Sequence, residues 1–174
     1  MPIAHRGLHS DGIPENSMAA YHAAAAKGYA IELDIRLTKD NQLVVFHDDD
    51  LRRIEKIDKK VIDCTLAQLE KVHIYGTRET IPSFERFLRE INGLTPILIE
   101  IKDVPRANKK DYIGRVVDAL KDYKGDFAVQ SFQPFLVKRF KKARPDIACG
   151  ILATAQYGKL NFNNSFIWKL KGKL

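Results

Sequence analysis

Short apolar runs rich in β-branched residues alternate with helix-like segments along most of the chain, and this alternation limits the fold more than any other feature. It is typical of a parallel sheet whose crossover helices cover it. The runs predict six strands, and the link between the second and third is too short for a helix, so a tight turn joins them. The predicted strands are Pro2–His5, Ala30–Leu37, Gln42–His47, Pro96–Lys102, Asp126–Phe132 and Asp146–Leu152.

Helix signals lie between these strands. Ser17 is a good N-terminal cap for an Ala-rich helix that Gly28 ends. Apolar residues at helical spacing from Phe84 to Ile91 predict another helix, which Gly93 stops. By the same reasoning we predict helices at Thr65–Val72, Pro82–Asn92, Lys109–Tyr123 and Gln133–Ala143.

The number of strands restricts the architecture further. A closed β/α barrel has eight strands and usually takes about 250 residues, whereas this chain has 174 residues. Residues 153–174 show no clear strand–helix–strand pattern. We therefore expect a single α/β domain over residues 1–174. It is either an open sheet or an incomplete β/α barrel of the TIM type, with about six of the eight strands.

Charge is distributed unevenly along the chain. Residues 1–132 carry 20 basic and 21 acidic side chains, whereas residues 133–174 carry 9 basic side chains and one acidic, Asp146. Basic runs of this kind are usually solvated faces. We therefore expect no nucleic-acid partner, and contact with an anionic membrane surface is the weaker alternative. The run includes Lys138, Arg139, Lys141, Lys142 and Arg144, with Lys169, Lys171 and Lys173 beyond.

The N-terminus and the cysteines do not indicate export. The N-terminus has no apolar stretch of signal-peptide length, and the longest apolar run, around Ala23–Ala26, is too short to cross a bilayer. Cys64 and Cys149 have no close partner at zinc-binding spacing, so we expect both to be small buried residues. A cytoplasmic protein is the expectation.

Two histidines end predicted strands, where β/α folds place catalytic loops. His5-Arg6-Gly7 ends the first strand and His47 ends the third. Two imidazoles at the mouth of one site suit general acid–base chemistry near neutral pH. Arg6 adds an obligatory cation, and Gly7 lets the backbone approach a phosphate closely. Taken alone, His5-Arg6-Gly7 fits a solvated loop equally well.

Other titratable residues lack such placement. We expect His22 and His73 to be surface or packing residues, and His9 to be at most a minor contact. The run Asp48–Asp50 lacks the spacing, glycine and terminal glutamate of a calcium loop. We interpret it as a solvated acidic loop.

The strand Ala30–Leu37 carries paired carboxylates. Successive side chains of a strand point to opposite faces, so Glu32 and Asp34 share one face with Arg36, opposite an apolar face. If helices cover the apolar face, these carboxylates point into a barrel or cleft and must bind a cation or share a proton. The alternative is a one-sided antiparallel strand with its charged face in water.

The strand Pro96–Lys102 repeats this pattern, with Glu100 and Lys102 on one face. A third carboxylate completes a site of oxygen ligands, which Mg²⁺ and Ca²⁺ prefer. The alternative is a plain ion pair between Glu100 and Lys102.

Taken together, the order and spacing of eight stretches resemble the glycerophosphodiester phosphodiesterase family across about residues 2–152. The stretches are Ile3-Ala-His-Arg-Gly, Pro14-Glu-Asn-Ser, Glu32-Leu-Asp, Leu37-Thr-Lys-Asp, Val44-Val-Phe-His-Asp, Ile81-Pro-Ser-Phe, Ile99-Glu-Ile-Lys and Gln130-Ser-Phe.

The resemblance implies an eight-stranded β/α barrel, a divalent cation, Mg²⁺ or Ca²⁺, and hydrolysis of glycerophosphodiesters to glycerol 3-phosphate and an alcohol. It also implies that about residues 48–93 form the family's characteristic insertion. By position, His5 and His47 become the acid and base, Glu32, Asp34 and Glu100 the metal ligands, and Arg6 and Lys102 the phosphate contacts; Glu15 and Asn16 steady the mouth of the first strand, and Gln130 and Ser131 line the site.

The chain departs from the family pattern after the sixth strand, because the last two β/α units are missing. We therefore expect a metal-dependent phosphodiesterase, and the alternative is an inactive remnant that retains metal or phosphate binding. Unpaired sheet edges favour pairing of two chains, so a homodimer through the open barrel edges is a further expectation.

Overall fold

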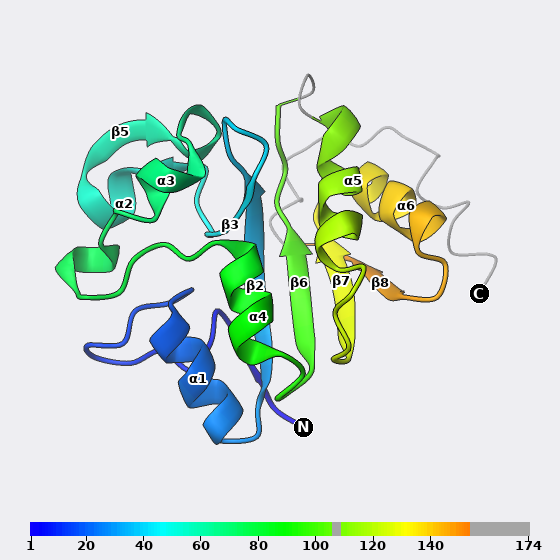
Figure 1. The fold of residues 1–174 in the computed structure, drawn as a ribbon, viewed down its shortest axis with the longest axis horizontal. Helices are drawn as coiled ribbons and strands as arrows, with labels where there is room; N and C mark the ends of the chain where they lie inside the picture. The colour runs from blue at the N-terminus through cyan, green and yellow to red at the C-terminus, as the bar shows by residue number, and fades with distance from the viewer. Residues whose placement is uncertain (106–108, 154–174) are drawn as a thin grey trace.

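The computed structural model describes residues 1–105 and 109–153, and these residues are organised around one sheet (Figure 1). Five parallel strands follow the order β1-β2-β6-β7-β8, and β3 pairs antiparallel with the end of β2. Each of the six strands predicted from the sequence is present. They are β1 (Ile3–Ala4), β2 (Ala30–Leu37), β3 (Leu43–Val45), β6 (Ile97–Ile101), β7 (Phe127–Ser131) and β8 (Ala148–Ile151).

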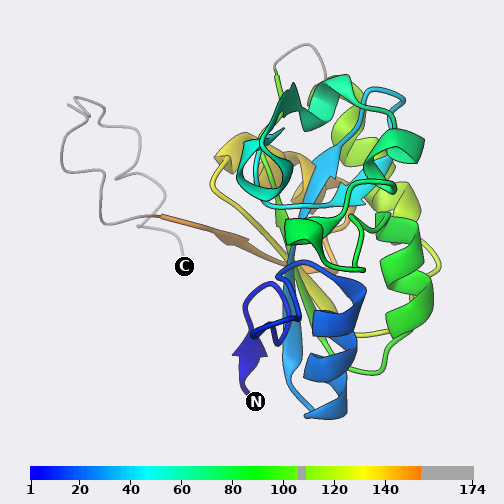
Figure 2. The same cartoon turned by 90° about the vertical axis from the view of Figure 1, so that its left-hand side faces the viewer.

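Helices cover one face of the sheet. Figures 1 and 2 show α1, α4 and α5 on the same side of β2 and β6, and α6 packs against β7 and β8. Serine caps begin two of them: the Ser17 hydroxyl accepts the Ala20 amide at 3.2 Å, and the Ser83 hydroxyl accepts the Arg86 amide at 3.3 Å. These helices are α1 (Met18–Ala26), α4 (Phe84–Ile91), α5 (Lys109–Ala119) and α6 (Pro134–Ala143).

The core lies between this helix layer and the sheet. The apolar face of β2, with Ile31, Leu33 and Ile35, is fully buried in one cluster with Tyr21 and Phe87. Burial of one large apolar side chain stabilises a fold by about 1.5–3 kcal/mol. This packing therefore fixes which face of β2 meets the helices, and it directs the side chains of the alternate positions to the opposite face.

Residues 48–81 form a small cap beside the end of β2, at the upper left of Figure 1. The cap has its own apolar core, in which Leu51, Ile54 and Ile74 are buried. Its strands and its first helix are not predicted from the sequence, because segments of two to four residues carry little periodic signal. The elements are β4 (Asp50–Leu51), α2 (Arg52–Glu55), β5 (Ile57–Lys60), the 3₁₀ turns η1 (Val61–Asp63) and η2 (Ile74–Gly76), and α3 (Leu66–Leu69).

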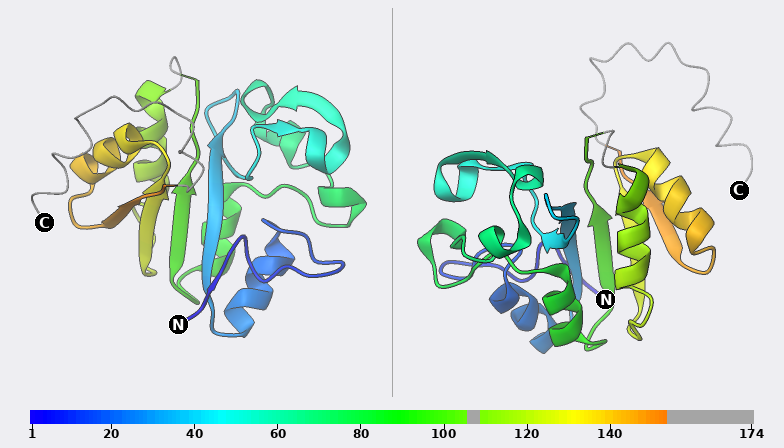
Figure 3. Two further views of the ribbon diagram at one scale, coloured as in Figure 1. Left: turned by 180° about the vertical axis from the view of Figure 1, so that it is seen from behind. Right: turned by 45° about the horizontal axis from the view of Figure 1, so that its top comes forward.

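The sheet is open in the described residues, with β1 and β8 as its end strands. Figure 3, left, shows the face of β2, β6 and β7 that the helices do not cover. Ile3 in β1 and Ile151 in β8 are 54% and 56% exposed, so both ends present apolar surface. The expected incomplete β/α barrel with about six strands is therefore present.

Several smaller expectations have mixed outcomes. Cys64 is buried, whereas Cys149 is only partly buried, and both are free thiols. Within 1–105 and 109–153, no helix combines the length and the hydropathy needed to cross a bilayer. Part of the basic C-terminal segment, namely Lys169, Lys171 and Lys173, lies outside the described residues.

Candidate active site

Three carboxylates meet on the face of the sheet that the helices leave uncovered. Asp34 of β2 lies beside Glu100 of β6 in the parallel register, and Glu32 lies two residues earlier on the same face. All three residues are buried: Glu32 is 4% exposed, Asp34 is 1% exposed and Glu100 is 7% exposed. One oxygen from each lies within 4.8 Å of the others. We call these three residues the carboxylate centre.

The surroundings of β2 exclude the alternative of a one-sided antiparallel strand in water. Parallel strands flank β2, namely β1 and β6, and both of its acidic side chains are buried. The other alternative, an ion pair between Glu100 of β6 and Lys102 directly after this strand, is observed. The Lys102 ammonium donates to Glu100 Oε1 at 2.6 Å. It also lies 2.9 Å from Asp34 Oδ1, so the ion pair and the carboxylate cluster exist together.

Asp34 is held firmly on one oxygen only. The Asn16 amide donates to Oδ2 at 3.0 Å, and Asn16 in turn accepts a hydrogen bond from the buried Tyr21 hydroxyl at 2.6 Å. The other oxygen, Oδ1, is buried and accepts no hydrogen bond within the described part of the chain, because Lys102 approaches it outside hydrogen-bond geometry. A buried carboxylate oxygen without a hydrogen bond is uncommon, and a bound cation would give this oxygen a further partner beside Lys102.

The packing of three buried carboxylates shifts the pKa of Glu32. Burial, and then the negative charge of Asp34, raise the pKa of Glu32 to about 7. The backbone amide of Arg6 donates to Glu32 Oε2 at 3.0 Å and partly offsets the effect. Arg6 has a φ of +57°, a conformation that few non-glycine residues adopt. The turn after β1 therefore aims this amide at the carboxylate.

The carboxylate centre fits a divalent cation. Its donors are all oxygens, which is the donor type of Mg²⁺ and Ca²⁺. Ligand oxygens lie about 2.3–2.6 Å from Ca²⁺, so two oxygens of one site are at most about 5 Å apart. The 4.8 Å limit between the three oxygens agrees with this span. Glu32, Asp34 and Glu100 are therefore the residues that would hold the cation.

The two predicted histidines lie at the ends of their strands, as expected from the sequence. The His5 ring is 67% exposed, and its Nε2 lies 4.0 Å from Glu32 Oε2. Partial burial, and then the charge of Arg6, lower the pKa of His5, and the charge of His47 acts in the same direction. His47 is half-buried, and its Nδ1 lies 2.6 Å from Asp48 Oδ1. The Arg36 guanidinium fixes the His47 carbonyl through bonds of 2.6 and 2.9 Å.

The loop after β1 is positioned by Glu15 and by a close packing contact. Arg6 Nη1 donates to both oxygens of Glu15, at 3.0 and 3.1 Å, and Arg6 Nε lies 3.5 Å from Asp34 Oδ2. Gly7 has a φ of +81°, and a Cβ there would lie 2.8 Å from the Cβ of Ala20. The glycine that we interpreted as space for a phosphate therefore serves the packing of this loop on α1.

A second cluster of charges lies beside the site, and the sequence pattern does not indicate it. Arg53 of α2 donates from Nε to Asp48 Oδ2 at 2.6 Å, from Nη2 to Glu15 Oε1, and from Nη1 to the Tyr75 hydroxyl. We call Glu15, Asp48, Arg53 and Tyr75 the Arg53 network. Asp48 is half-buried in it, so the interpretation of Asp48–Asp50 as a solvated loop is wrong for Asp48.

Partial burial alone would raise the pKa of both acids of the network, but the hydrogen bonds from Arg53 and the charges nearby dominate. The pKa of Glu15 and that of Asp48 are therefore below their usual values. The one sequence signal for Asp48 is its place directly after a histidine at a strand end. Arg53 had no such signal, because its partners Glu15 and Tyr75 are distant in sequence.

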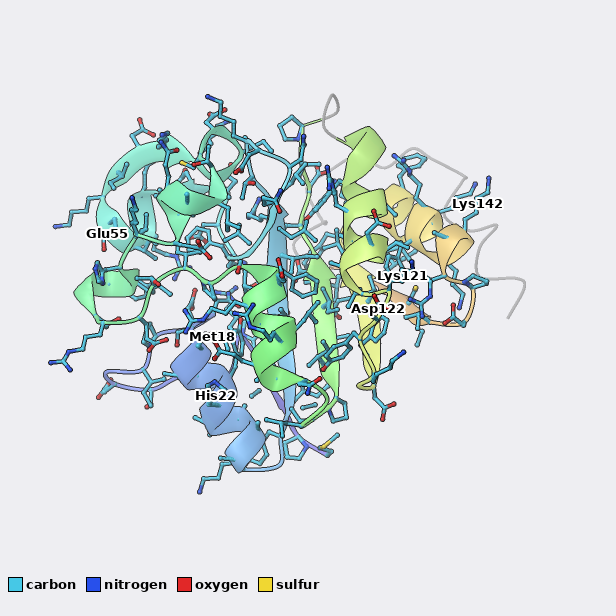
Figure 4. The ribbon with its side chains drawn as sticks, in the orientation of Figure 1. Met18, His22, Glu55, Lys121, Asp122 and Lys142 are labelled. Carbon is cyan, nitrogen blue, oxygen red and sulfur yellow. The ribbon has the colours of Figure 1, made fainter. Side chains whose placement is uncertain are left out.

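Two of the remaining histidines, His22 and His73, have partners outside the carboxylate centre. His22 is on α1, on the helix-covered side of the sheet (Figure 4), where its Nε2 is 3.1 Å from Glu90. His73 is exposed, and its Nδ1 lies 2.8 Å from the Thr77 carbonyl. Ser131, which we expect to line the site with Gln130, is buried and donates its hydroxyl to the Ile101 carbonyl at 2.6 Å.

Comparison with known proteins places these features in a family. The sequence profile of the Glycerophosphoryl diester phosphodiesterase family matches residues 5–171. The chain is 35% identical over 169 residues to "Putative glycerophosphodiester phosphodiesterase YhdW" of Bacillus subtilis (strain 168), with 92% of this chain and 69% of that protein covered. It is 33% identical to a Glycerophosphodiester phosphodiesterase of Caldanaerobacter subterraneus, with 86% of this chain and 65% of that protein covered.

Solved structures agree with the sequence matches. A phosphodiesterase of Oleispira antarctica, in complex with the product sn-glycerol-3-phosphate, superposes with a TM-score of 0.82 at 27% identity, over 98% of this chain and 70% of that one. A glycerophosphodiester phosphodiesterase of Parabacteroides distasonis gives 0.75 at 28% identity, over 84% and 62%. The chain thus spans about two thirds of the length of its relatives. In sequence and in fold, this chain belongs to the glycerophosphoryl diester phosphodiesterase family.

Proposed function

We propose that the protein hydrolyses glycerophosphodiesters to glycerol 3-phosphate and an alcohol, with a divalent cation held by Glu32, Asp34 and Glu100. The convergence of these three buried carboxylates from β2 and β6, next to His5, is the observation that carries the proposal. The family membership supports the reaction, and the product bound to the Oleispira antarctica phosphodiesterase supports the substrate class.

The proposed roles follow from residue type and position. The cation, Mg²⁺ or Ca²⁺, supplies positive charge that offsets the charge of the phosphodiester. Arg6 and Lys102 contact the phosphoryl oxygens, and a guanidinium suits this task because it binds two oxygens at once. The charged groups of Arg6 and Lys102 each lie within 3.5 Å of an Asp34 oxygen, so both side chains are next to the carboxylate centre.

His5 and His47 divide the proton transfers. One ring takes the proton of the attacking hydroxyl, from water or from the glycerol part of the substrate, while its oxygen forms a bond to phosphorus. The phosphorus–oxygen bond to the alcohol breaks, and the other ring protonates the departing alkoxide. If the glycerol hydroxyl is the attacker, the product of this step is a cyclic phosphate, which water then hydrolyses to glycerol 3-phosphate. Imidazole is suited to both tasks near neutral pH.

The test is release of glycerol 3-phosphate from glycerophosphocholine by the purified chain, with Mg²⁺ or Ca²⁺ and with or without a chelator. The proposal expects turnover that the chelator abolishes and that added cation restores. Cation binding by calorimetry without any turnover would favour the second candidate, a folded chain that binds metal or phosphate without catalysis. The open sheet of the described residues is the observation behind this second candidate.

Three expectations, about cellular location, metabolic role and oligomeric state, stay predictions. They are a cytoplasmic location, a role in lipid and glycerol metabolism, and a homodimer that pairs the open edges at β1 and β8. The mass in solution at micromolar concentration, measured by light scattering, tests the last of these. A monomer would contradict it.

A further inference from the structure

Arg53 is bound on all three of its guanidinium nitrogens, and each partner comes from a different segment of the chain. Asp48 lies in the loop after β3, Glu15 lies in the loop before α1, and Tyr75 lies in η2. The Tyr75 ring also lies beneath the guanidinium, with its centroid 5.8 Å from Cζ. A planar group held at three points in this way has little freedom to rotate.

The first of these partners controls the His47 ring. Asp48 accepts from Arg53 on Oδ2, at 2.6 Å, and its Oδ1 lies 2.6 Å from His47 Nδ1. An ionised carboxylate only accepts hydrogen bonds, so Nδ1 must carry the proton of this contact. The neutral ring then has its free electron pair on Nε2, which is the nitrogen left for the substrate.

The second partner controls Arg6. Glu15 accepts from Arg53 on Oε1, and both of its oxygens accept from Arg6 Nη1. Arg6 follows His5 directly and lies next to Asp34. Through one carboxylate on each side, Arg53 thus connects the loop that carries His47 with the loop that carries His5 and Arg6.

We propose that Arg53 is a positioning residue of this site, which orients His47 through Asp48 and Arg6 through Glu15. The proposal deepens the proposed phosphodiesterase function, and its kinetic test rests on that function. It assigns a task to the cap, because α2 presents Arg53 and η2 presents Tyr75.

Geometry, rather than charge alone, is what the proposal requires. A lysine at position 53 would keep the positive charge, but a single ammonium lacks the planar fork that reaches Asp48, Glu15 and Tyr75 together. Tyr75 adopts a φ of +52°, which is uncommon for an aromatic residue. The backbone of η2 is therefore held in an unusual conformation at the residue that contacts Arg53.

The neighbouring Arg52 is a matched control. It lies on the same short helix and pairs with Asp50 and Asp58 at 3.0 Å, but its side chain is 62% exposed. Both of these partners belong to the cap, and neither is a residue of the carboxylate centre or of the Arg53 network. Arg52→Ala therefore removes an arginine and two ion pairs from α2 without touching the proposed connection.

The first experiment uses nitrogen-15 NMR of the full chain to determine which ring nitrogen of His47 carries the proton. The His47→Gln variant assigns the signals of this ring. In the wild type, and in Arg52→Ala, we expect the neutral ring to carry its proton on Nδ1. In Arg53→Ala and Arg53→Lys, the fraction of this tautomer should fall by at least half. This measurement needs no substrate, so it decides the proposal even if the wild type shows no phosphodiesterase activity.

The second experiment compares kinetics on glycerophosphocholine. Misplacement of a catalytic group reduces turnover by about 10- to 100-fold, so we expect kcat to fall by this factor in Arg53→Ala and in Arg53→Lys. The kcat of Arg52→Ala should stay within twofold of the wild type. Tyr75→Phe, which keeps both carboxylate contacts, should lose less than the two Arg53 variants.

Some results would overturn the proposal. Arg53 variants that keep the wild-type tautomer would do so, and so would an Arg53→Lys variant with wild-type kcat. If Arg53→Ala does not fold, as judged by its melting transition, the Arg53→Lys variant and the Arg52→Ala control carry the same comparison. An inactive wild type with the expected change of tautomer would contradict the proposed function but would support the role of Arg53.

Discussion

The carboxylate centre and the Arg53 network are connected through Arg6, but their charged groups differ in burial and in pairing. In the carboxylate centre, three acidic side chains are almost completely buried, and Asp34 Oδ1 lacks a hydrogen bond. In the Arg53 network, every charged group has a partner, and the Arg53 side chain is 42% exposed.

The difference is visible in the direction of the pKa shifts. Burial and like charge raise the pKa of Glu32, so the folded state disfavours the ionised form of this carboxylate. Hydrogen bonds from Arg53 overcome burial and lower the pKa of Glu15 and Asp48, so the fold favours their ionised forms. Raised carboxylate pKa values, as at Glu32, are expected where a site binds a ligand. Lowered values, as at Glu15 and Asp48, are expected where charged groups support the structure around it.

Each region has one histidine beside it, and replacing these rings gives the largest expected effect. His5→Ala and His47→Ala should each lower glycerol 3-phosphate release by about 10²- to 10⁴-fold, the usual contribution of a general acid or base. The melting temperature should change little, because His5 is mostly exposed and His47 is half-buried. A variant that keeps more than a tenth of wild-type turnover would remove that histidine from the chemistry.

The next prediction separates the two regions by cation binding. Glu32→Ala should weaken Mg²⁺ or Ca²⁺ binding by at least about 100-fold, since even residues behind the ligands contribute about 10- to 100-fold. Without metal, its melting temperature should stay the same or rise, because one of three crowded buried carboxylates is gone.

Glu15→Ala is the opposite case and serves as the matched control. It should leave cation affinity within a few-fold of the wild type and lower the melting temperature, because it leaves Arg6 without its bidentate partner. Calorimetric titration and thermal unfolding measure both quantities. A large loss of metal-free stability in Glu32→Ala would instead identify Glu32 as part of a structural ion pair.

Acid sensitivity of the fold should depend on the Arg53 network. The ordinary pKa values of Glu and Asp are 4.5 and 3.8, and those of Glu15 and Asp48 are lower in the folded state. Their ionised forms therefore add stability that is present above about pH 4.5 and is lost as the pH falls through the lowered values. In Arg53→Ala, the stability lost between pH 7 and pH 3.5 should be smaller by about 1 kcal/mol.

Urea unfolding at both pH values, with Arg52→Ala in parallel, measures this difference. An Arg53→Ala protein with the pH dependence of the wild type would show that the two carboxylates gain nothing from the network. The same comparison in high salt should change little for a network that is partly buried.

The smallest effect is expected outside both regions. Arg86 and Glu90 on α4 form a partly exposed ion pair one helical turn apart, with Nε 2.7 Å from the carboxylate. Arg86→Ala should cost about 0.3–0.5 kcal/mol in unfolding free energy, and turnover should not change. A loss of turnover in this variant would show that the assay responds to general stability, and it would weaken every comparison above.

The local pattern of the sequence was sufficient to predict several parts of the site. Alternation along Ala30–Leu37 places Glu32 and Asp34 on one face, because a strand turns each side chain to the side opposite its neighbour. Strand ends are visible in the same way, which locates His5 and His47 at the ends of β1 and β3. Such features need only the chain's own periodicity, so they are independent of partners.

The contacts between distant segments were decided by the tertiary structure, although the sequence had already assigned Glu100 to the same site as Glu32 and Asp34. Glu100 meets Asp34 because β6 pairs with β2 in one particular register, and a slip of one residue would turn it to the other face. Arg53 meets Glu15 because the cap folds back over the loop before α1, across 38 residues of sequence. The raised pKa of Glu32 has the same origin, since burial exists only after the chain has packed.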